Sequence, residues 1–277
     1  MTRIIVGTDD YTFEMVRPWG TLPAGMSFGT ISHVAVDSAD RVYVYHRGDP
    51  PVVVFDTDGN YLSSWGSGVI ADAHGIYMTP DDDLFMVDRD VHEVIKFTLD
   101  GKPLLRLGQR EKPALQAPFN HPTDVAVAPN GDIYVSDGYA NSCVHRFDAE
   151  GKYILSWGSP GADSGQFTTP HGIWAPEDGR IYVTDRENNR VQVFSPEGDY
   201  LDQWSVRIGA MDIFMDPKGN FFVTDQTPGF TVFDRDGTIV TRARTFENAH
   251  GLWGDSKGNM YLAPATIGGL MTKLIKQ

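Results

Sequence analysis

Residues 170–186 read PHGIWAPEDGRIYVTDR. A short apolar run is followed by a polar turn at Asp178-Gly179, and the turn is followed by a second run rich in Ile, Tyr and Val. Two such runs on either side of an Asp-Gly turn are typical of a β-hairpin. This segment therefore predicts two antiparallel strands joined by a tight turn.

The same pattern occurs at five other places in the chain. The matching segments begin at Ser32, Ala73, Thr123, Met211 and Ala249. After each of the first five hairpins comes a second pair of runs, such as VVVFDTDGNYLSSWG at 52–66 and VQVFSPEGDYLDQWS at 191–205. Four antiparallel strands in about 40 to 50 residues have the size of one β-propeller blade. The repeats therefore predict six blades.

The two ends of the chain predict how the ring of blades closes. The sixth unit ends after three strands, at LMTKLIKQ, residues 270–277. The stretch FEMVRPWG, residues 13–20, ends in the same Trp-Gly that closes the fourth strands at Trp65 and Trp157. We expect residues 13–20 to be the outer strand of the sixth blade. The sequence thus predicts an all-β fold, a six-bladed β-propeller that takes up residues 1–277 as a single domain.

The composition limits which classes of partner the protein is expected to bind and the compartment in which it is expected to occur. A formal net charge of −14 argues against nucleic acids and anionic membranes, which select basic surfaces. The apolar stretch at residues 4–7 is too short for a signal-peptide core, and no apolar run is long enough to span a bilayer. The single cysteine, Cys143, suits a reducing compartment. We predict a cytoplasmic protein, and the sequence does not specify its oligomeric state.

One register of the repeat collects ionisable side chains. Aligned at the start of the first strand, the six units carry His33, His74, Asp124, His171, Asp212 and His250. The first strand of each propeller blade lines the central channel, so these residues are expected to form a ring at one channel mouth. Neutral imidazole nitrogens are suitable ligands for zinc and other borderline divalent ions.

Three of these histidines share a further feature. His74, His171 and His250 each precede a glycine in the phrase H-G-[IL], and they belong to the second, fourth and sixth units. A single histidine at such a position would more often hydrogen-bond only water and backbone. A catalytic zinc site, however, takes three protein ligands and an open position. We predict that these three bind Zn²⁺ or another divalent transition metal, and that His33, Asp124 and Asp212 have a secondary role at the mouth.

The loops after the second strands are expected at the same mouth, because the first two strands of a unit are antiparallel. Aspartates recur there and are expected to hydrogen-bond the neighbouring backbone. The residues that differ between units are Arg47, Arg89, Tyr139 and Arg186. An arginine offers a planar fork to a carboxylate, and a tyrosine near a metal can act as a general base. For Arg89 we expect only a solvated surface position.

At these residues the chain resembles the peptidyl-α-hydroxyglycine α-amidating lyases, which are six-bladed propellers with NHL-type repeats. The matching text is HPTDVAVAPNGDIYVSDGYANSCVHRF, residues 121–147, and GQFTTPHGIWAPEDGRIYVTDRENNRVQVF, residues 165–194. The resemblance is strong in the third and fourth units and looser in the first, second and sixth. It implies zinc ligands at His74, His171 and His250, a base at Tyr139, and substrate-binding arginines at Arg47 and Arg186.

The chain also departs from the pattern of that family. The family's last zinc histidine is followed by an aspartate that helps to hold a structural Ca²⁺, whereas Gly251 follows His250 here. Asn248 and Ala249 replace the proline and methionine that precede this histidine in the family. These changes make a structural Ca²⁺ doubtful and indicate a changed substrate, and amidation of peptide hormones is not expected.

The leading prediction is a zinc-dependent lyase. Its substrate would be a small α-hydroxy or α-hydroxyglycine compound, and Arg47 and Arg186 would neutralise the substrate carboxylate while Tyr139 takes the hydroxyl proton. Two alternatives stay open. A metal-dependent hydrolase such as a lactonase is supported by Asp124 and Asp212, and a non-catalytic NHL module would bind a protein partner through one open face.

Overall fold

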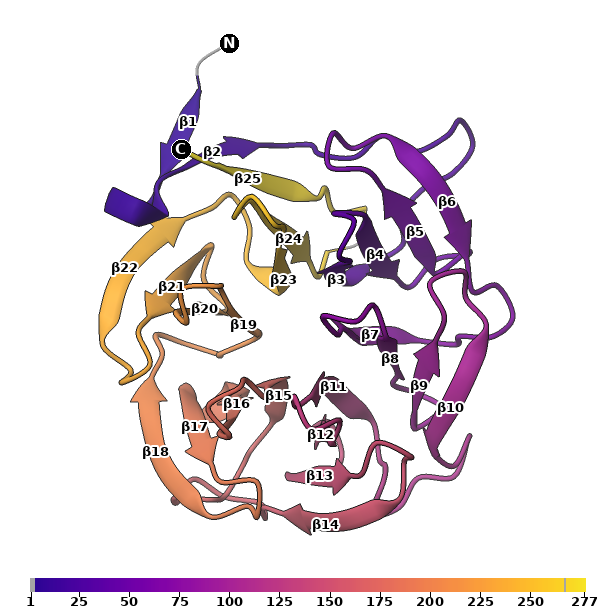
Figure 1. Cartoon of the computed structure of the whole chain (residues 1–277), viewed down its shortest axis with the longest axis vertical. Helices are drawn as coiled ribbons and strands as arrows, with labels where there is room; N and C mark the ends of the chain where they lie inside the picture. Colours follow the sequence, from indigo (N-terminus) through magenta and orange to yellow (C-terminus); the bar gives the residue numbers. More distant parts are fainter. Residues whose placement is uncertain (1–2, 267) are drawn as a thin grey trace.

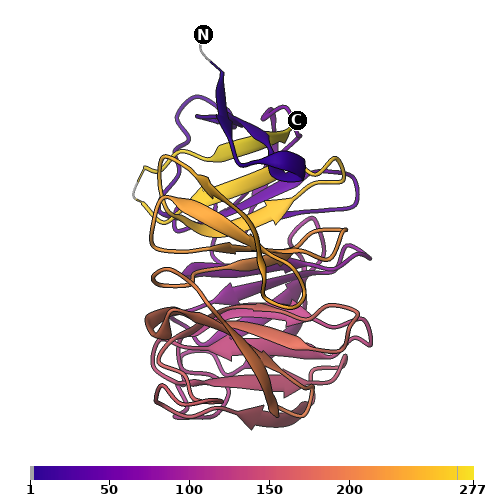
Figure 2. The ribbon, with the colours of Figure 1, turned by 90° about the vertical axis from the view of Figure 1, so that its left-hand side faces the viewer.

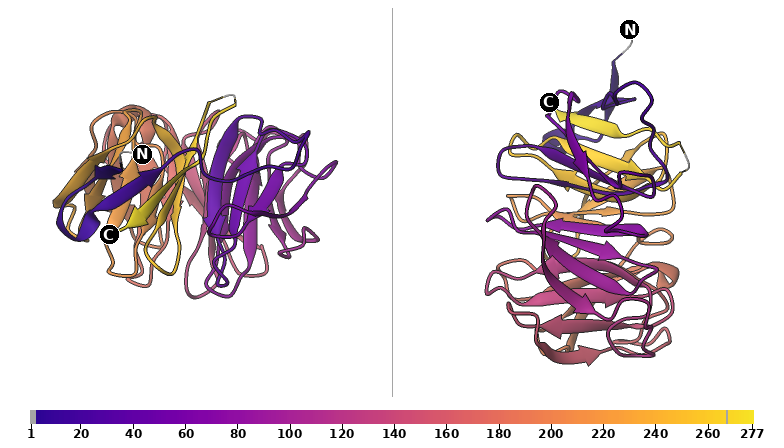
Figure 3. Two further views of the ribbon diagram at one scale, coloured as in Figure 1. Left: turned by 90° about the horizontal axis from the view of Figure 1, so that it is seen from above. Right: turned by 90° about the vertical axis from the view of Figure 1, so that its right-hand side faces the viewer.

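Six antiparallel sheets stand as blades around one central axis in the computed structural model (Figure 1). The structure describes residues 3–266 and 268–277. Seen edge-on, the strands cross the thickness of the disc, so the loops between them gather on its two flat faces (Figures 2 and 3). The all-β six-bladed propeller predicted from the repeats is confirmed.

The blades are numbered in chain order. Blade 1 contains β3 (Ile31–Val36), β4 (Val42–His46), β5 (Val52–Phe55) and β6 (Tyr61–Trp65). Blade 2 contains β7 (Ala73–Met78), β8 (Leu84–Asp88), β9 (Glu93–Phe97) and β10 (Pro103–Gly108). Blade 3 contains β11 (Pro122–Val127), β12 (Ile133–Asp137), β13 (Cys143–Phe147) and β14 (Tyr153–Trp157).

Blade 4 contains β15 (Pro170–Trp174), β16 (Ile181–Asp185), β17 (Arg190–Phe194) and β18 (Tyr200–Ser205). Blade 5 contains β19 (Ile213–Met215), β20 (Phe221–Thr224), β21 (Gly229–Phe233) and β22 (Ile239–Arg244). Blade 6 contains β23 (Ala249–Gly254), β24 (Met260–Pro264), β25 (Thr272–Lys276), β2 (Phe13–Val16) and β1 (Ile4–Val6). The two 3₁₀ turns in the described part of the chain are η1 (Asp9–Tyr11) and η2 (Arg186–Asn188).

Blade 6 joins the two ends of the chain. Strand β2 pairs with β25 in antiparallel register, from Phe13 opposite Lys276 to Val16 opposite Lys273, and β1 lies outside β2 as a fifth strand. The expected strand at residues 13–20 is therefore shorter, because it ends at Val16, just before Arg17-Pro18, and proline has no N–H to donate. Trp19 instead packs between blades, with its ring 4.8 Å from Tyr261 and 5.5 Å from Phe55.

The repeated Trp-Gly at the end of a unit has a packing role between neighbouring blades. Trp65, at the end of blade 1, lies against the Asp-Gly turn of blade 2, where a Cβ on Gly101 would be 2.6 Å from its ring. Trp157, at the end of blade 3, covers Gly198 of blade 4 in the same way, at 2.7 Å. Both glycines have positive φ, +89° and +87°, so the turn itself also favours glycine.

The core lies between the faces of adjacent blades. The inner strands β3, β7 and β15 are buried at every position, whereas the outer strand β6 is largely solvent-accessible. Cys143 is buried in β13, and burial raises the pKa of its thiol, as suits a packing residue rather than a nucleophile. None of the helices in the described part of the chain has the length and apolar character needed to cross a bilayer.

Candidate metal centre

The predicted ring of ionisable residues lies in the channel, where the inner strands begin. His74, His171 and His250 are the second residues of β7, β15 and β23. His33 and Asp124 are the third residues of β3 and β11, and Asp212 directly precedes β19. The strand register shifts beside the five of these positions that lie within a strand, which marks a local bulge. Bulges of this kind re-aim side chains, here toward the channel axis.

Each of the three H-G histidines is held by the next blade. The Nδ1 atom of His74 lies 2.6 Å from the carbonyl oxygen of Thr123, and that of His171 lies 2.8 Å from the carbonyl of Met211. The Nδ1 atom of His250 lies 2.8 Å from the carbonyl of Ser32, across the closure of the ring. A carbonyl only accepts hydrogen bonds, so Nδ1 carries the proton and Nε2 presents its lone pair.

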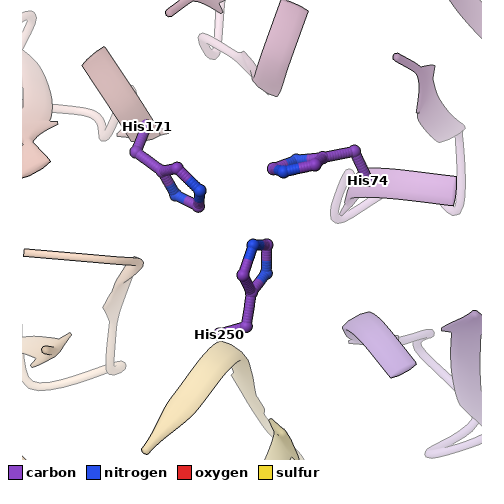
Figure 4. Close-up of side chains that lie close together, drawn as sticks. All are labelled: His74, His171 and His250. Atoms are coloured by element: carbon purple, nitrogen blue, oxygen red, sulfur yellow. The ribbon is translucent and has the colours of Figure 1, made fainter. Parts of the chain in front are cut away.

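The Nε2 atoms of the three histidines converge on one point. Figure 4 shows the rings of His74, His171 and His250 facing one another from three sides of the channel. The ring centroids are 4.7 to 5.1 Å apart, and one ligand nitrogen of each lies within 4.8 Å of the others. Three neutral imidazoles with fixed tautomers and converging nitrogens fit a divalent transition metal such as Zn²⁺.

The electrostatics of the pocket keep these imidazoles neutral. Burial lowers the pKa of all three, and the pKa of His250 falls to about 3. After burial, the charges of neighbouring histidines lower the pKa of His74, followed by those of Arg47 and Arg89. For His171 the further causes are His250 and Arg186. Neutral imidazole is the form that binds a metal, so the site is ready for one without losing a proton.

The glycine after each histidine leaves room for the ring residue of the next blade. A Cβ on Gly75 would lie 2.4 Å from a carboxylate oxygen of Asp124, and a Cβ on Gly172 would lie 2.9 Å from the Cα of Asp212. A Cβ on Gly251 would lie 2.6 Å from the ring of His33. Around the channel, the three H-G histidines alternate with a second set of three residues, His33, Asp124 and Asp212. The glycine after each histidine is needed because a member of this second set lies against it.

The second set, His33, Asp124 and Asp212, forms a buried acid–base cluster beside the three histidines. The Nε2 atom of His33 lies 2.9 Å from a carboxylate oxygen of Asp212. Burial acts to lower the pKa of His33, but Asp212 and Asp124 outweigh it and raise the pKa to about 9. Burial raises the pKa of Asp124 to about 8. Backbone N–H groups of Ile173 and Leu252 donate to Asp124 and Asp212, which ties this set to blades 4 and 6.

Tyr139 covers the three histidines on the side of the mouth. Its hydroxyl oxygen is 2.9 Å from Nε2 of His74 and 3.2 Å from Nε2 of His171. The histidines themselves are 1 to 5% exposed, whereas Tyr139 is 36% exposed. The phenol therefore lies between solvent and the pocket, in contact with two of the proposed ligands.

Two arginines flank the ring of Tyr139, and a third, Arg47, is linked to one of them through Asp72. The Cζ atoms of Arg89 and Arg186, from the blades on either side, lie 5.2 and 5.3 Å from the centre of its ring. The Nε atom of Arg89 lies 2.9 Å from a carboxylate oxygen of Asp72, and the Nε atom of Arg47 lies 3.2 Å from the other oxygen of the same carboxylate. The expectation that Arg89 is merely solvated at the surface was wrong, because its charge stacks on the ring of Tyr139.

The repeated aspartates after the second strands are structural, as predicted. Asp88 accepts hydrogen bonds from the backbone of Ala71 and Asp72, and Asp185 accepts one from Thr168. Asp137 accepts one from the backbone of Asn120 and lies 3.1 Å from Nε2 of His145. Cys143 completes this last group, which has metal-ligand chemistry but is held inside blade 3 by hydrogen bonds to Oδ2 of Asp137 and between His145 and Ser156.

An aromatic plug, consisting of Tyr77, Trp174, Phe214 and Trp253, closes the channel toward the opposite face. Three of its members stand three residues after the H-G histidines on β7, β15 and β23, and their ring centroids are 5.2 to 5.4 Å apart. Phe214 of β19 packs against both tryptophans at 5.3 and 5.5 Å. Among the described residues, the plug therefore blocks the approach to the histidine pocket from the face opposite Tyr139.

The structure brings together all nine residues singled out from the sequence. It places the three H-G histidines in one cluster, His33 with the two aspartates in a second, and Arg47, Tyr139 and Arg186 above them. Sequence reasoning missed Asp72 and the aromatic plug. The plug had a visible signal, the Tyr or Trp that ends each phrase HGIY, HGIW and HGLW at residues 74–77, 171–174 and 250–253. Asp72 had none, because it lies in an irregular loop.

Comparison with known proteins gives matches in sequence and in fold. The NHL repeat family matches residues 119–147 and 167–194, in blades 3 and 4. Peptidylglycine alpha-amidating monooxygenase of Rattus norvegicus is 32% identical over 203 residues, which cover 61% of this chain and 21% of that protein. Peptidyl-alpha-hydroxyglycine alpha-amidating lyase 1 of Drosophila melanogaster is 30% identical over 217 residues, which cover 65% of this chain and 40% of that protein.

The alignments thus span about a fifth of the rat protein and two fifths of the fly protein. Among solved structures, a gluconolactonase of Xanthomonas campestris has a TM-score of 0.71 at 16% identity, with 96% of this chain and 90% of that chain covered. At that identity the similarity shows the shared propeller fold alone.

Proposed function

We propose that this chain, a homologue of the peptidyl-α-hydroxyglycine α-amidating lyases, is a metal-dependent lyase that splits small α-hydroxyglycine compounds. The observation that carries the proposal is the contact between Tyr139 and two of three converging histidines, His74 and His171. The homology, the propeller fold and this constellation point to the same reaction class, although fold alone would not.

His74, His171 and His250 would hold the metal, and Zn²⁺ suits three neutral imidazoles best. When bound, such an ion supplies Lewis acidity toward a hydroxyl or carboxylate oxygen of the substrate. The hydrogen bonds from Nδ1 to Thr123, Met211 and Ser32 fix the orientation of the three rings. Rings held in this way need no reorganisation when the ligand arrives.

Tyr139 would move the proton of the reaction. As the phenolate, its oxygen takes the proton from the α-hydroxyl group, and the electrons of that O–H bond form the new C=O bond. The C–N bond breaks, its electrons go to the leaving nitrogen, and the same proton is delivered there from Tyr139. The products are a primary amide and glyoxylate, so atoms and charges balance without an added oxidant or reductant.

Arg47 and Arg186 would bind the substrate carboxylate at the mouth. Their side chains are 29% and 17% exposed. The Nε atom of Arg47 donates to the carbonyl oxygen of Ala73 and lies 3.2 Å from Asp72, and that of Arg186 donates to Glu187. A guanidinium that is held at Nε can use its Nη groups to bind a planar carboxylate. In Arg186 one of them, Nη1, also lies 3.4 Å from the hydroxyl oxygen of Tyr139. The substrate would therefore lie with its carboxylate near the arginines and its hydroxyl near Tyr139.

A single preparation tests the proposal. Protein without a polyhistidine tag is loaded with Zn²⁺, dialysed, analysed for metal and assayed for glyoxylate release from N-acetyl-α-hydroxyglycine. We expect one bound metal per chain and turnover, both lost in the triple variant His74→Ala, His171→Ala, His250→Ala, with the circular dichroism of the fold retained. Bound metal without turnover of α-hydroxyglycines, but with turnover of lactones, would favour a hydrolase instead.

A ligand set of acidic residues, which the hydrolase alternative needs, is less well supported. The carboxylates of Asp124 and Asp212 accept hydrogen bonds from the backbone of Ile173, Ile213 and Leu252. The carboxylate of Asp212 also faces His33 at 2.9 Å. Three of these four oxygens are engaged by the fold, the exception being Oδ1 of Asp124, whereas the Nε2 atoms of the three H-G histidines face one another.

A further inference from the structure

Arg89 is a third guanidinium at the mouth, beside the two arginines assigned to the substrate carboxylate. It shares the half-buried carboxylate of Asp72 with Arg47, which places both on the same side of Tyr139, whereas Arg186 reaches the ring from blade 4. Its side chain is only 20% exposed. This placement gives Arg89 access to the same space as Arg47.

Arg89 uses its Nε atom for contacts with the protein and keeps its two Nη groups for a ligand. Its Nε atom lies 2.8 Å from a carboxylate oxygen of Asp90 and 2.9 Å from one of Asp72. Among the described residues, neither Nη group of Arg89 or Arg47 makes a hydrogen bond to the protein. Five N–H donors in a fixed plane are best matched by a carboxylate, which can accept from two of them at once.

The charge at this side of the mouth also favours an anion. Arg47 and Arg89 face two carboxylates, Asp72 and Asp90, but Asp90 is 52% exposed and its charge is screened by solvent. An anionic group on the ligand would balance this excess.

We propose that Arg89 is a third substrate-binding residue and that it makes the site selective for α-hydroxyglycines whose acyl group carries a second carboxylate. The inference rests on the proposed function, because it assigns the first carboxylate to Arg47 and Arg186. The second carboxylate would accept hydrogen bonds from the Nη groups of Arg89, on the blade 2 side of Tyr139. The substrate is therefore a dicarboxylate. One carboxylate leaves with glyoxylate, and the other stays on the amide product.

Two pairs of compounds test this selectivity. The reactive pair is N-succinyl-α-hydroxyglycine and its neutral counterpart, N-succinamoyl-α-hydroxyglycine, compared by kcat/KM for glyoxylate release. The inert pair is N-succinylglycine and N-succinamoylglycine, which lack the hydroxyl group and are compared by calorimetric Kd. In each pair, only the charge of the terminal group differs.

We expect the zinc-loaded protein to prefer the dicarboxylate by about tenfold or more in both comparisons, as hydrogen bonds to a charged group imply. Arg89→Gln should bring both ratios close to one while the neutral compound is still turned over, and Arg89→Lys should keep part of the preference. The matched control is Arg41→Gln, because Arg41 is also held through Nε by an aspartate, Asp37, but lies on the opposite face. This control should leave both ratios unchanged.

The outcomes separate the two proposals. Equal values for the two members of each pair in the unmodified protein, or an equal loss for both members in Arg89→Gln, would overturn the selectivity. If the dicarboxylate preference appears in binding and disappears in Arg89→Gln, but no glyoxylate is released from either reactive compound, the lyase function fails and the anion selectivity of Arg89 stands.

Discussion

The hydroxyl oxygen of Tyr139 lies 2.9 Å from the Nε2 atom of His74, although the two residues belong to different blades. This contact joins the residue proposed as the base to a residue proposed as a metal ligand. It also places the phenol between solvent and the histidine pocket. The chemistry proposed for the site depends on this one relationship more than on any other.

Replacing Tyr139 by Phe keeps the ring between Arg89 and Arg186 but removes the oxygen that faces the histidines. We expect kcat for glyoxylate release to fall by about 100-fold or more, the usual contribution of a general acid–base group. Bound zinc, measured by elemental analysis, should not change. Tyr153→Phe, in the solvent-accessible strand β14, is the control, and unaltered kcat in Tyr139→Phe would contradict the role of the hydroxyl.

Gly172→Ala should disturb the site without removing any functional side chain. The added methyl group would lie 2.9 Å from the Cα of Asp212 and 3.0 Å from the carbonyl oxygen of Met211, which holds His171. Overpacking of this kind costs about 1–3 kcal/mol of unfolding free energy. We expect a lower Tm and a weaker zinc affinity in competition with a chelator. Full affinity for zinc would show that blades 4 and 5 separate without strain.

Trp174→Ala should lower the free energy of unfolding without changing the zinc content of the protein. Trp174 packs against Tyr77, Phe214 and Trp253 with ring centroids 5.2 to 5.3 Å away. Loss of such a ring costs about 3–5 kcal/mol. In urea unfolding we expect this loss, together with an unchanged zinc content, because the plug lies below the histidines. Loss of zinc in protein that is still folded would mean that the plug also shapes the metal pocket.

The metal-free protein should lose stability when the pH falls below about 6.5, the usual pKa of histidine. Burial lowers the pKa of His74, His171 and His250, so the unfolded chain binds protons that the native state does not. Stability therefore decreases as the pH falls from 6.5. Urea unfolding at pH 6.5 and pH 5 measures the effect, which should be smaller in the triple alanine variant of these histidines.

The same protein should also lose stability as the pH rises from about 6.5 to 9. Here the native state holds protons that the unfolded chain releases, because the pKa of His33 is raised to about 9 and that of Asp124 to about 8. Stability from a raised pKa is present at low pH and is lost as the pH rises through it. The variant His33→Gln, Asp124→Asn should have a flatter profile between pH 6.5 and 9, and a profile as steep as that of the unmodified protein would contradict the assignment.

The propeller could be predicted because its signals are local and repeated. Two apolar runs and a turn indicate each hairpin, as in residues 170–186. Six copies of this pattern predict a propeller. The ring positions followed from the same alignment, since equivalent residues of equivalent strands meet around one axis. The predicted strand at residues 13–20 was too long, because pairing with the partner strand β25 ends at Val16.

The environment of Arg89 could not be predicted in this way. Its sequence neighbourhood, VDRD at residues 87–90, looks like a charged surface loop. What makes it part of the mouth is Tyr139 from blade 3 and the carboxylate of Asp72, which it shares with Arg47 from blade 1. Contacts among three blades have no periodic signal in the chain.

The sequence by itself determined the blade, the number of blades and the residue types that face the channel, because hydrophobic alternation and turn residues act over short distances. Only the tertiary structure decided which atoms meet. The carbonyl of Met211 sets the tautomer of His171, and the Cα of Asp212 explains why Gly172 must lack a side chain. Closing a ring brings residues about 40 positions apart into contact, and that distance exceeds the reach of any local preference.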